Sequence, residues 1–284
     1  ATMNDVGITV LLAIVGVIIT AIMVVKNIKG NILWGILITW ILGIICQFTG
    51  LYVPNAEIGF GSLLPDFSNG LAIPSIMPVF GKLDFSGVAS LEFAVVVFAF
   101  LFVDLFDTIG TLIGVSSKAG MLDKGGKLPR VRGALLADAV ATTAGAVLGT
   151  STTTTFVESA SGVAEGGRTG LTAVTTAVLF GLALFLSPIF LAIPSFATAP
   201  ALIVVGFYML TNVVNIDFND YAEAIPCYIC IAAMPFFYSI SEGIAMGVIS
   251  YVAIHIFTGV KKGRKVSALM YVLAVLFILK YILL

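Results

Sequence analysis

Apolar stretches of roughly membrane-spanning length follow one another through most of this chain. The hydrocarbon core of a bilayer is about 30 Å thick and is crossed by a helix of roughly 20 apolar residues. Hydrophobic residues make up 60% of the 284 and charged residues only 10%, whereas a soluble domain carries about 25% charged residues. We therefore expect an all-α polytopic protein, a multi-pass integral membrane protein. The expected spans are Val6–Val25, Ile32–Phe48, Ser90–Ser116, 133–149, Leu171–Phe190, Ala199–Val214, Tyr221–Tyr238, Gly243–Phe257 and Val266–Leu284.

Basic residues gather in three of the loops between these spans. Residues 26–30 and 261–265 are short and basic, and residues 118–132 carry five basic side chains against a single Asp123. Two expected spans separate the first and second of these loops, and six crossings separate the second from the third if residues 150–165 count as one crossing. The positive-inside rule therefore places all three in the cytoplasm.

Residues 49–88 are the longest hydrophilic stretch and contain four prolines. Their apolar pieces are too short to span a bilayer, so we expect an extramembrane loop with one short surface helix. The chain begins at Ala1 and enters an apolar segment without a basic leader or a cleavage site. We expect the N-terminal part of a longer protein to be missing here.

Two aspartates lie deep in the third apolar stretch. Asp104, Asp107, Thr108 and Thr111 have the spacing i, i+3, i+4, i+7, which puts them on one helix face. Carboxylates inside a membrane are costly and usually functional. Two negative charges one turn apart repel, which makes this pair a candidate proton carrier. The alternative is that each aspartate only bonds to a hydroxyl on a neighbouring helix.

A polar run interrupts the apolar pattern at residues 150–155, where a serine and five threonines precede Phe156, Val157 and Glu158. We expect a short strand and then a half-helix over Val157–Glu165, because irregular backbone at membrane depth survives only inside protein or beside a cavity. Glu158 would then meet the positive end of that half-helix. The alternative is that Glu158 only caps it.

Five other polar or reactive residues lie in or near the apolar segments. Asp138 is expected to bond to the threonine run, Glu165 to sit at the interface, and His255 to pack on a helix face. Cys227 and Cys230 form one CxxC with no second pair and no nearby histidine, so small apolar residues in a helix are the better interpretation. We expect no metal site and no cofactor.

Enzyme motifs are weak in this sequence. The segment 107–111 (DTIGT) superficially resembles the phosphorylation motif of ion pumps, but it lacks the lysine and no nucleotide-binding domain accompanies it. An intramembrane aspartyl protease would need aspartates on two helices, whereas this pair lies on one. Basic patches for nucleic acid are also absent. We therefore expect a transporter, not an enzyme, whose site uses the carboxylates.

Five longer segments resemble the AzgA-type adenine/guanine/hypoxanthine permeases of the nucleobase–cation symporter superfamily, also called nucleobase–ascorbate transporters. The likeness covers most of the chain from about residue 90. The segments are 102–114 (FVDLFDTIGTLIG), 149–162 (GTSTTTTFVESASG), 166–171 (GGRTGL), 197–201 (ATAPA) and 235–243 (PFFYSISEG).

The resemblance implies a uracil-transporter-like fold of two inverted repeats, divided into a core domain and a gate domain. The chain looks like the C-terminal two-thirds of such a carrier, with the first repeat largely missing. On this basis residues 1–48 would be gate helices of the first repeat and 49–88 an extramembrane loop. Residues 89–192 would be the core domain of the second repeat, and 193–284 its gate domain.

The same resemblance implies a purine site. Asp107 matches the carboxylate of a D/E-x-I-G pattern, and Glu158 the acidic residue after the second strand. The remaining candidate substrate-binding residues are Asp104, Thr111, Phe156 and Val157. Asp107, Glu158 and Asp104 are the candidates for proton coupling.

These expectations combine into a secondary active importer of adenine, guanine or hypoxanthine in the plasma (cell inner) membrane. Its partners would be the purine nucleobase, H⁺ as coupling ion and membrane lipids, with no nucleic acid. A homodimer is one option for its assembly. The alternatives are a carrier of anions or other nucleobases with the same fold, an intramembrane aspartyl protease, or a structural half that transports nothing alone.

Overall fold

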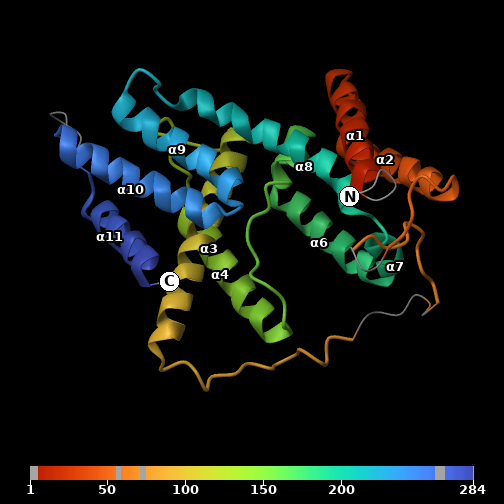
Figure 1. The fold of residues 1–284 in the computed structure, drawn as a ribbon, viewed down its shortest axis with the longest axis horizontal. Helices are drawn as coiled ribbons and strands as arrows, with labels where there is room; N and C mark the ends of the chain where they lie inside the picture. The colour runs from red at the N-terminus through yellow and green to blue at the C-terminus, as the bar shows by residue number, and fades with distance from the viewer. Residues whose placement is uncertain (1–5, 56–58, 69, 71–74, 260–265, 284) are drawn as a thin grey trace. The chain divides into compact units, whose positions relative to one another are not determined.

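The apolar stretches of the sequence are helices in the computed structural model (Figure 1). It describes residues 6–55, 59–68, 70, 75–259 and 266–283, and within these residues it contains no β-strand. The expected all-α polytopic fold is therefore confirmed. The helices are α1 (Ile8–Val25), α2 (Asn31–Phe48), α3 (Leu91–Lys118), α4 (Val131–Leu148), α5 (Ser159–Ala164), α6 (Gly170–Phe185), α7 (Ser187–Leu191), α8 (Ser195–Leu210), α9 (Tyr221–Phe237), α10 (Ile240–Thr258) and α11 (Ala268–Leu283), with a 3₁₀ turn at Thr211–Asn215.

In the described part of the chain, six helices have the length and hydropathy needed to cross a membrane: α1, α2, α3, α4, α8 with its 3₁₀ extension, and α10. The apolar helices α6, α9 and α11 are shorter. The expected span Leu171–Phe190 is broken into α6 and α7 at Leu186. Pro188 explains the break, because its ring would clash with the carbonyl one turn earlier in a continuous helix.

The loop after α2 is held by side chains of that helix. Trp40 Nε1 donates to the Leu63 carbonyl over 2.9 Å, and Gln47 Oε1 accepts from the Leu63 amide over 2.9 Å. The Tyr52 hydroxyl donates to the Gly61 carbonyl over 2.8 Å. The short surface helix expected in residues 49–88 is not found among the described residues of this stretch, which form turns and one isolated bridge.

The chain divides into two compact units. The first comprises Ala1–Leu83 and Thr111–Leu210, and the second comprises Asp84–Gly110 and Thr211–Leu284. The boundary falls inside α3, so the first part of this helix belongs to the second unit and its end to the first.

In the first unit, α1, α2 and α8 pack against one another (Figure 1). The hairpin of α1 and α2 closes through reciprocal glycine–threonine contacts: Gly16 faces Thr39, and Gly35 faces Thr20. A Cβ on Gly16 would lie 2.5 Å from Thr39 Oγ1 and 2.7 Å from Pro200 Cγ of α8. Small residues at such crossings let membrane helices approach closely.

In the second unit, α10 packs on α9 and α11. Gly243 of α10 lies against the Cys230 carbonyl of α9, where an added Cβ would be 2.9 Å from the oxygen. Val248, Leu273 and Phe277 form the apolar core, and Phe102 of α3 packs edge-on against Phe277 with ring centroids 6.0 Å apart.

Candidate functional site

Helix α3 is continuous through Asp104, Asp107, Thr108 and Thr111, so these acidic and hydroxyl residues lie on one face of it, as predicted. Asp104 and Asp107 are half-buried, whereas Thr108 and Thr111 are 1% and 6% exposed. Asp104, Asp107 and Thr108 belong to the second unit, and Thr111 belongs to the first.

The polar run after α4 is extended, but it is not the strand that the sequence predicted. Residues 151–156 have no regular secondary structure, and hydrogen bonds tie the middle of the run to helix α4. The Thr142 hydroxyl of α4 donates to the Thr153 carbonyl over 2.9 Å, accepts from the Thr153 amide over 3.2 Å and lies 3.1 Å from Thr152 Oγ1. The Thr142 side chain therefore anchors the middle of this segment to α4.

Two glycines at the end of α4 leave room for the polar run to turn away. Gly149 has φ +81°, and a Cβ there would lie 2.6 Å from Val79 Cβ. A Cβ on Gly145 would lie 2.8 Å from Thr150 Oγ1. A larger residue in place of Gly145 would displace the start of the polar run, and one in place of Gly149 would collide with Val79.

The predicted half-helix is present as α5. Glu158 directly precedes it, but the Glu158 side chain makes no capping hydrogen bond, and the capping alternative is therefore wrong for this structure. Phe156 and Val157 are 57% and 40% exposed, and the Glu158 side chain is exposed too. The structure thus brings these three candidates together at the start of α5, in the first unit with Thr111.

The other residues singled out by sequence have local roles. His255 is buried, its Nδ1 lies 2.8 Å from the Tyr251 carbonyl and its ring stacks on Tyr251 with centroids 4.2 Å apart, so the packing interpretation of His255 is confirmed. Cys227 and Cys230 carry free thiols in α9. Asp138 is half-buried in α4.

One interaction escaped the sequence analysis. Glu165, directly after α5, accepts a hydrogen bond from the Gly30 amide over 2.9 Å, across 135 residues of sequence. Gly30 has φ +69°, a conformation that glycine adopts at little cost, and this orients its amide in the turn between α1 and α2. The available signals were the glycine of this turn and the acidic residue at the end of the predicted half-helix.

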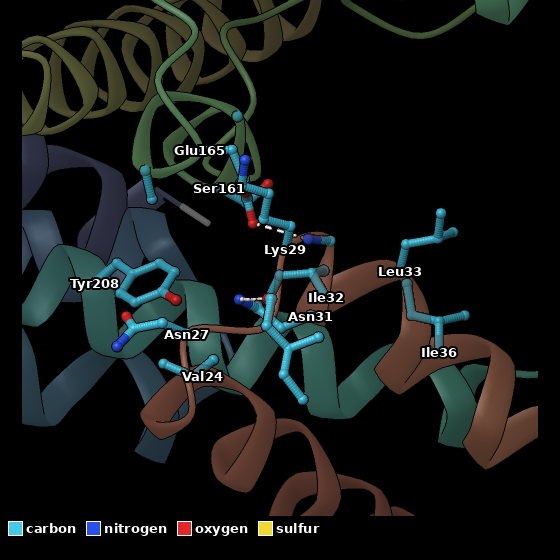
Figure 2. A pocket seen from close by; sticks show the side chains of 14 residues that line it. Val24, Asn27, Lys29, Asn31, Ile32, Leu33, Ile36, Ser161, Glu165 and Tyr208 are labelled. Atoms are coloured by element: carbon cyan, nitrogen blue, oxygen red, sulfur yellow. Dashed lines mark hydrogen bonds between the residues drawn. The ribbon is translucent and has the colours of Figure 1, made fainter.

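A cavity of about 610 Å³ lies beside this hydrogen bond, within the first unit (Figure 2). The α1–α2 turn, the two helix ends that flank it, α5 and α8 form its walls. The lining residues are Val24, Asn27, Ile28, Lys29, Gly30, Asn31, Ile32, Leu33, Ile36, Ser161, Gly162, Ala164, Glu165 and Tyr208.

The family model and three relatives that match this chain are described as permeases. A model described as the Permease family matches residues 2–246. The chain is 47% identical over 96% of its length to the putative permease MJ0326 of Methanocaldococcus jannaschii. It is 41% identical over 96% of its length to the adenine permease AdeP of Escherichia coli, and 44% identical over 95% to the guanine/hypoxanthine permease PbuO of Bacillus subtilis.

The chain spans 59%, 58% and 60% of the lengths of these three relatives. The matches support the resemblance drawn from residues 102–114 and 149–162, because they place the chain within the nucleobase permease superfamily. Combined with the six helices of the described residues that are long enough to cross a bilayer, they identify the chain as a multi-pass integral membrane protein that belongs to the Permease family.

Proposed function

We propose that this protein takes part in secondary active import of purine nucleobases across the plasma membrane, as a transporter and not an enzyme. Relatives at 41% and 44% identity are named as adenine and guanine/hypoxanthine permeases. The observation that carries the proposal is the presence, in a chain of this family, of an acidic helix face and of an exposed carboxylate at the start of a half-helix.

Carboxylates suit a purine edge. A carboxylate can accept two N–H bonds from one edge of a flat base, which orients the base as well as binding it. Guanine and hypoxanthine present such donors, and adenine offers its amino group. We assign Asp107 and Glu158 as the principal ligands. Asp104 tunes the pair or serves as a third ligand. Thr111, Phe156 and Val157 complete the proposed substrate site around these carboxylates.

Proton symport follows from the same groups. A protonated carboxyl donates a hydrogen bond where the carboxylate only accepts, so the state of Asp107, Glu158 or Asp104 couples proton and base. In this proposal residues 89–192 act as a core domain. Residues 1–48 and 193–284 act as the gate, and residues 49–88 form an extramembrane loop. The packing of α8 on α1 and α2 supports this grouping of gate helices. Movement of the core against the gate exposes the site alternately.

The test is uptake of radiolabelled adenine, guanine and hypoxanthine by cells that lack their own purine carriers and express the protein. Glu158→Gln and Asp107→Asn should abolish or sharply reduce uptake, whereas Asp66→Asn, which alters an exposed carboxylate of the 49–88 loop, should not. Wild-type kinetics in Glu158→Gln would contradict the assignment. A protonophore should collapse accumulation, while replacement of Na⁺ by K⁺ should leave it unchanged.

Two other functions are less well supported. Three acidic residues would repel an inorganic anion, which argues against anion exchange. An aspartyl protease would need aspartates on two helices, whereas Asp104 and Asp107 both lie on α3. Cleavage of membrane peptides without purine uptake would favour the protease.

A further inference from the structure

We propose that the cavity beside Glu165 is a second purine-binding site, through which the base passes on its way to the cytoplasm. This inference rests on the proposed function and deepens it. The cavity volume of about 610 Å³ falls in the range of roughly 300–1,000 Å³ found for small-molecule sites. All of its lining residues belong to the first unit, so its walls come from elements that pack together.

The charge of the cavity lining favours a neutral ligand. Lys29 and Glu165 are its only charged members among the described residues, and their charges cancel. The phosphate of a nucleotide would meet one cation and one carboxylate in this lining, so it would gain little net attraction there. A free nucleobase carries no such charge. The apolar side chains of Val24, Ile32 and Ile36 can contact its ring faces.

Tyr208 provides a surface on which a flat base can stack. Figure 2 shows its ring at the cavity with the hydroxyl directed towards the α1–α2 turn. The Lys118 ammonium lies 5.3 Å from the ring centroid, and this cation–π contact helps to fix the position of the ring. Aromatic rings bind bases through offset or edge-on stacking.

The polar groups around Tyr208 match the edges of a purine. Glu165 Oε1 accepts the Gly30 amide, and within the described residues this is its one hydrogen bond. A carboxylate has about four lone-pair positions, so Glu165 can also accept an N–H of the base. Asn31 donates through Nδ2 to the Ile28 carbonyl over 3.0 Å, which fixes the orientation of its side-chain amide. The Asn31 Oδ1 atom can then accept a hydrogen bond from the base. Asn27 adds a second amide.

The half-helix α5 connects this cavity to the proposed transport site. Glu158 directly precedes α5, while Ser161, Gly162 and Glu165 line the cavity. Six residues of helix are about 9 Å long, so a base released by Glu158 has one short helix to pass. The basic turn at residues 26–30 is cytoplasmic by the positive-inside rule, which places the cavity on the exit side.

Transport measured from each face separately tests the proposal. Right-side-out and inside-out vesicles should be compared for radiolabelled adenine and hypoxanthine. Tyr208→Leu should raise the half-saturating concentration at the cytoplasmic face roughly ten-fold, since a stacking contact with a base has about that effect, and should leave the outer face near wild type. Tyr208→Phe keeps the ring and should raise this concentration far less than Tyr208→Leu does. Phe207→Leu is the matched control, because Phe207 is 61% exposed and is not among the lining residues.

A labelling experiment gives a readout that does not depend on transport. In protein with Cys46, Cys227 and Cys230 replaced by alanine, Leu33→Cys, at a lining residue with no assigned contact to the base, should react with a membrane-permeant maleimide, and adenine should slow the reaction. The protection should persist when Glu158→Gln is added, because that change affects only the transport site.

Absence of protection, or equal effects of Tyr208→Leu at both faces, would overturn the exit site while leaving purine transport intact. If the wild-type protein neither moves nor binds purines, the proposed function fails and the exit site fails with it.

Discussion

Glu242, in the first turn of α10, pairs with Lys280 near the end of α11 and also accepts a hydrogen bond from the Tyr281 hydroxyl. The side chains of Lys280 and Glu242 are only 23% and 22% exposed. A half-buried ion pair of this kind ties the last helix of the chain to α10, alongside the apolar contacts of Leu273 and Phe277.

Breaking this pair should destabilise the protein. Lys280→Met leaves the Glu242 carboxylate half-buried without its cation, and we expect a loss of about 1–3 kcal/mol in the free energy of unfolding. The double variant Glu242→Gln/Lys280→Met should recover part of the loss, because neither charge is then left alone. Thermal unfolding in detergent measures both. The control is Lys82→Met, which alters an exposed lysine. Strictly additive losses would show that the two side chains do not interact.

Gly16→Ala should weaken the packing of α1 against α2 and α8. The added methyl would lie 2.5 Å from Thr39 Oγ1 and 2.7 Å from Pro200 Cγ, and overpacking of this kind costs about 1–3 kcal/mol. Gly206→Ala is the matched control, since Gly206 lies in α8 with nothing within 4 Å of an added Cβ. The melting temperature should fall in the first variant and hold or rise in the second. Equal melting temperatures would contradict the tight crossing.

Thr142→Val should loosen the polar run at residues 150–155. The hydroxyl of Thr142 makes the contacts to Thr152 and Thr153, whereas the neighbouring Thr143 bonds only to the Ala139 carbonyl of its own helix over 2.8 Å. Hydrogen–deuterium exchange at the Thr153 amide should therefore be faster in Thr142→Val and unchanged in Thr143→Val. If the run positions Glu158, purine uptake should fall in the first variant alone. Unchanged exchange at Thr153 would show that other contacts hold the run.

Tyr52 should make the loop after α2 sensitive to alkaline pH. Burial raises the pKa of its phenol above the ordinary value of 10.0, so the folded protein favours the neutral form. The contribution of Tyr52 to stability is then complete below pH 10 and is lost as the pH rises from there through the raised pKa. Melting temperatures measured between pH 8 and pH 12 should fall more steeply for the wild type than for Tyr52→Phe. Parallel curves would exclude the effect.

Hydropathy predicted most of the helices because a bilayer demands apolar residues over a fixed length. The break near Pro188 is an exception that hydropathy does not predict. One proline hardly changes the mean hydropathy of a segment, but its ring prevents the helix from continuing. Conversely, α8 continues through Pro200 and α9 through Pro226 and Pro235. Proline in these sequences therefore marks a local backbone cost, and the packing around it decides whether the helix ends.

The candidate site was only partly accessible to sequence reasoning. The face of α3 and the half-helix after Glu158 follow from local spacing and composition. The conformation of residues 151–156 does not, because threonines favour extended backbone wherever a partner exists, and here the partner is Thr142 of α4. The bond from Gly30 to Glu165 joins residues 135 positions apart. It depends on how α5 lies against the α1–α2 turn, which no local pattern encodes.

The reciprocal fit of Gly16 with Thr39 and of Gly35 with Thr20 also bears on the order of events during biosynthesis. Both contacts join neighbouring helices, so α1 and α2 can pair in the bilayer soon after the second of them leaves the ribosome. Pro200, which closes the third side of the same crossing, is made much later. We therefore predict that the α1–α2 hairpin forms first and that α8 packs on it afterwards. Substitution of the hairpin glycines should then lower the yield of inserted protein as well as the stability of the finished protein.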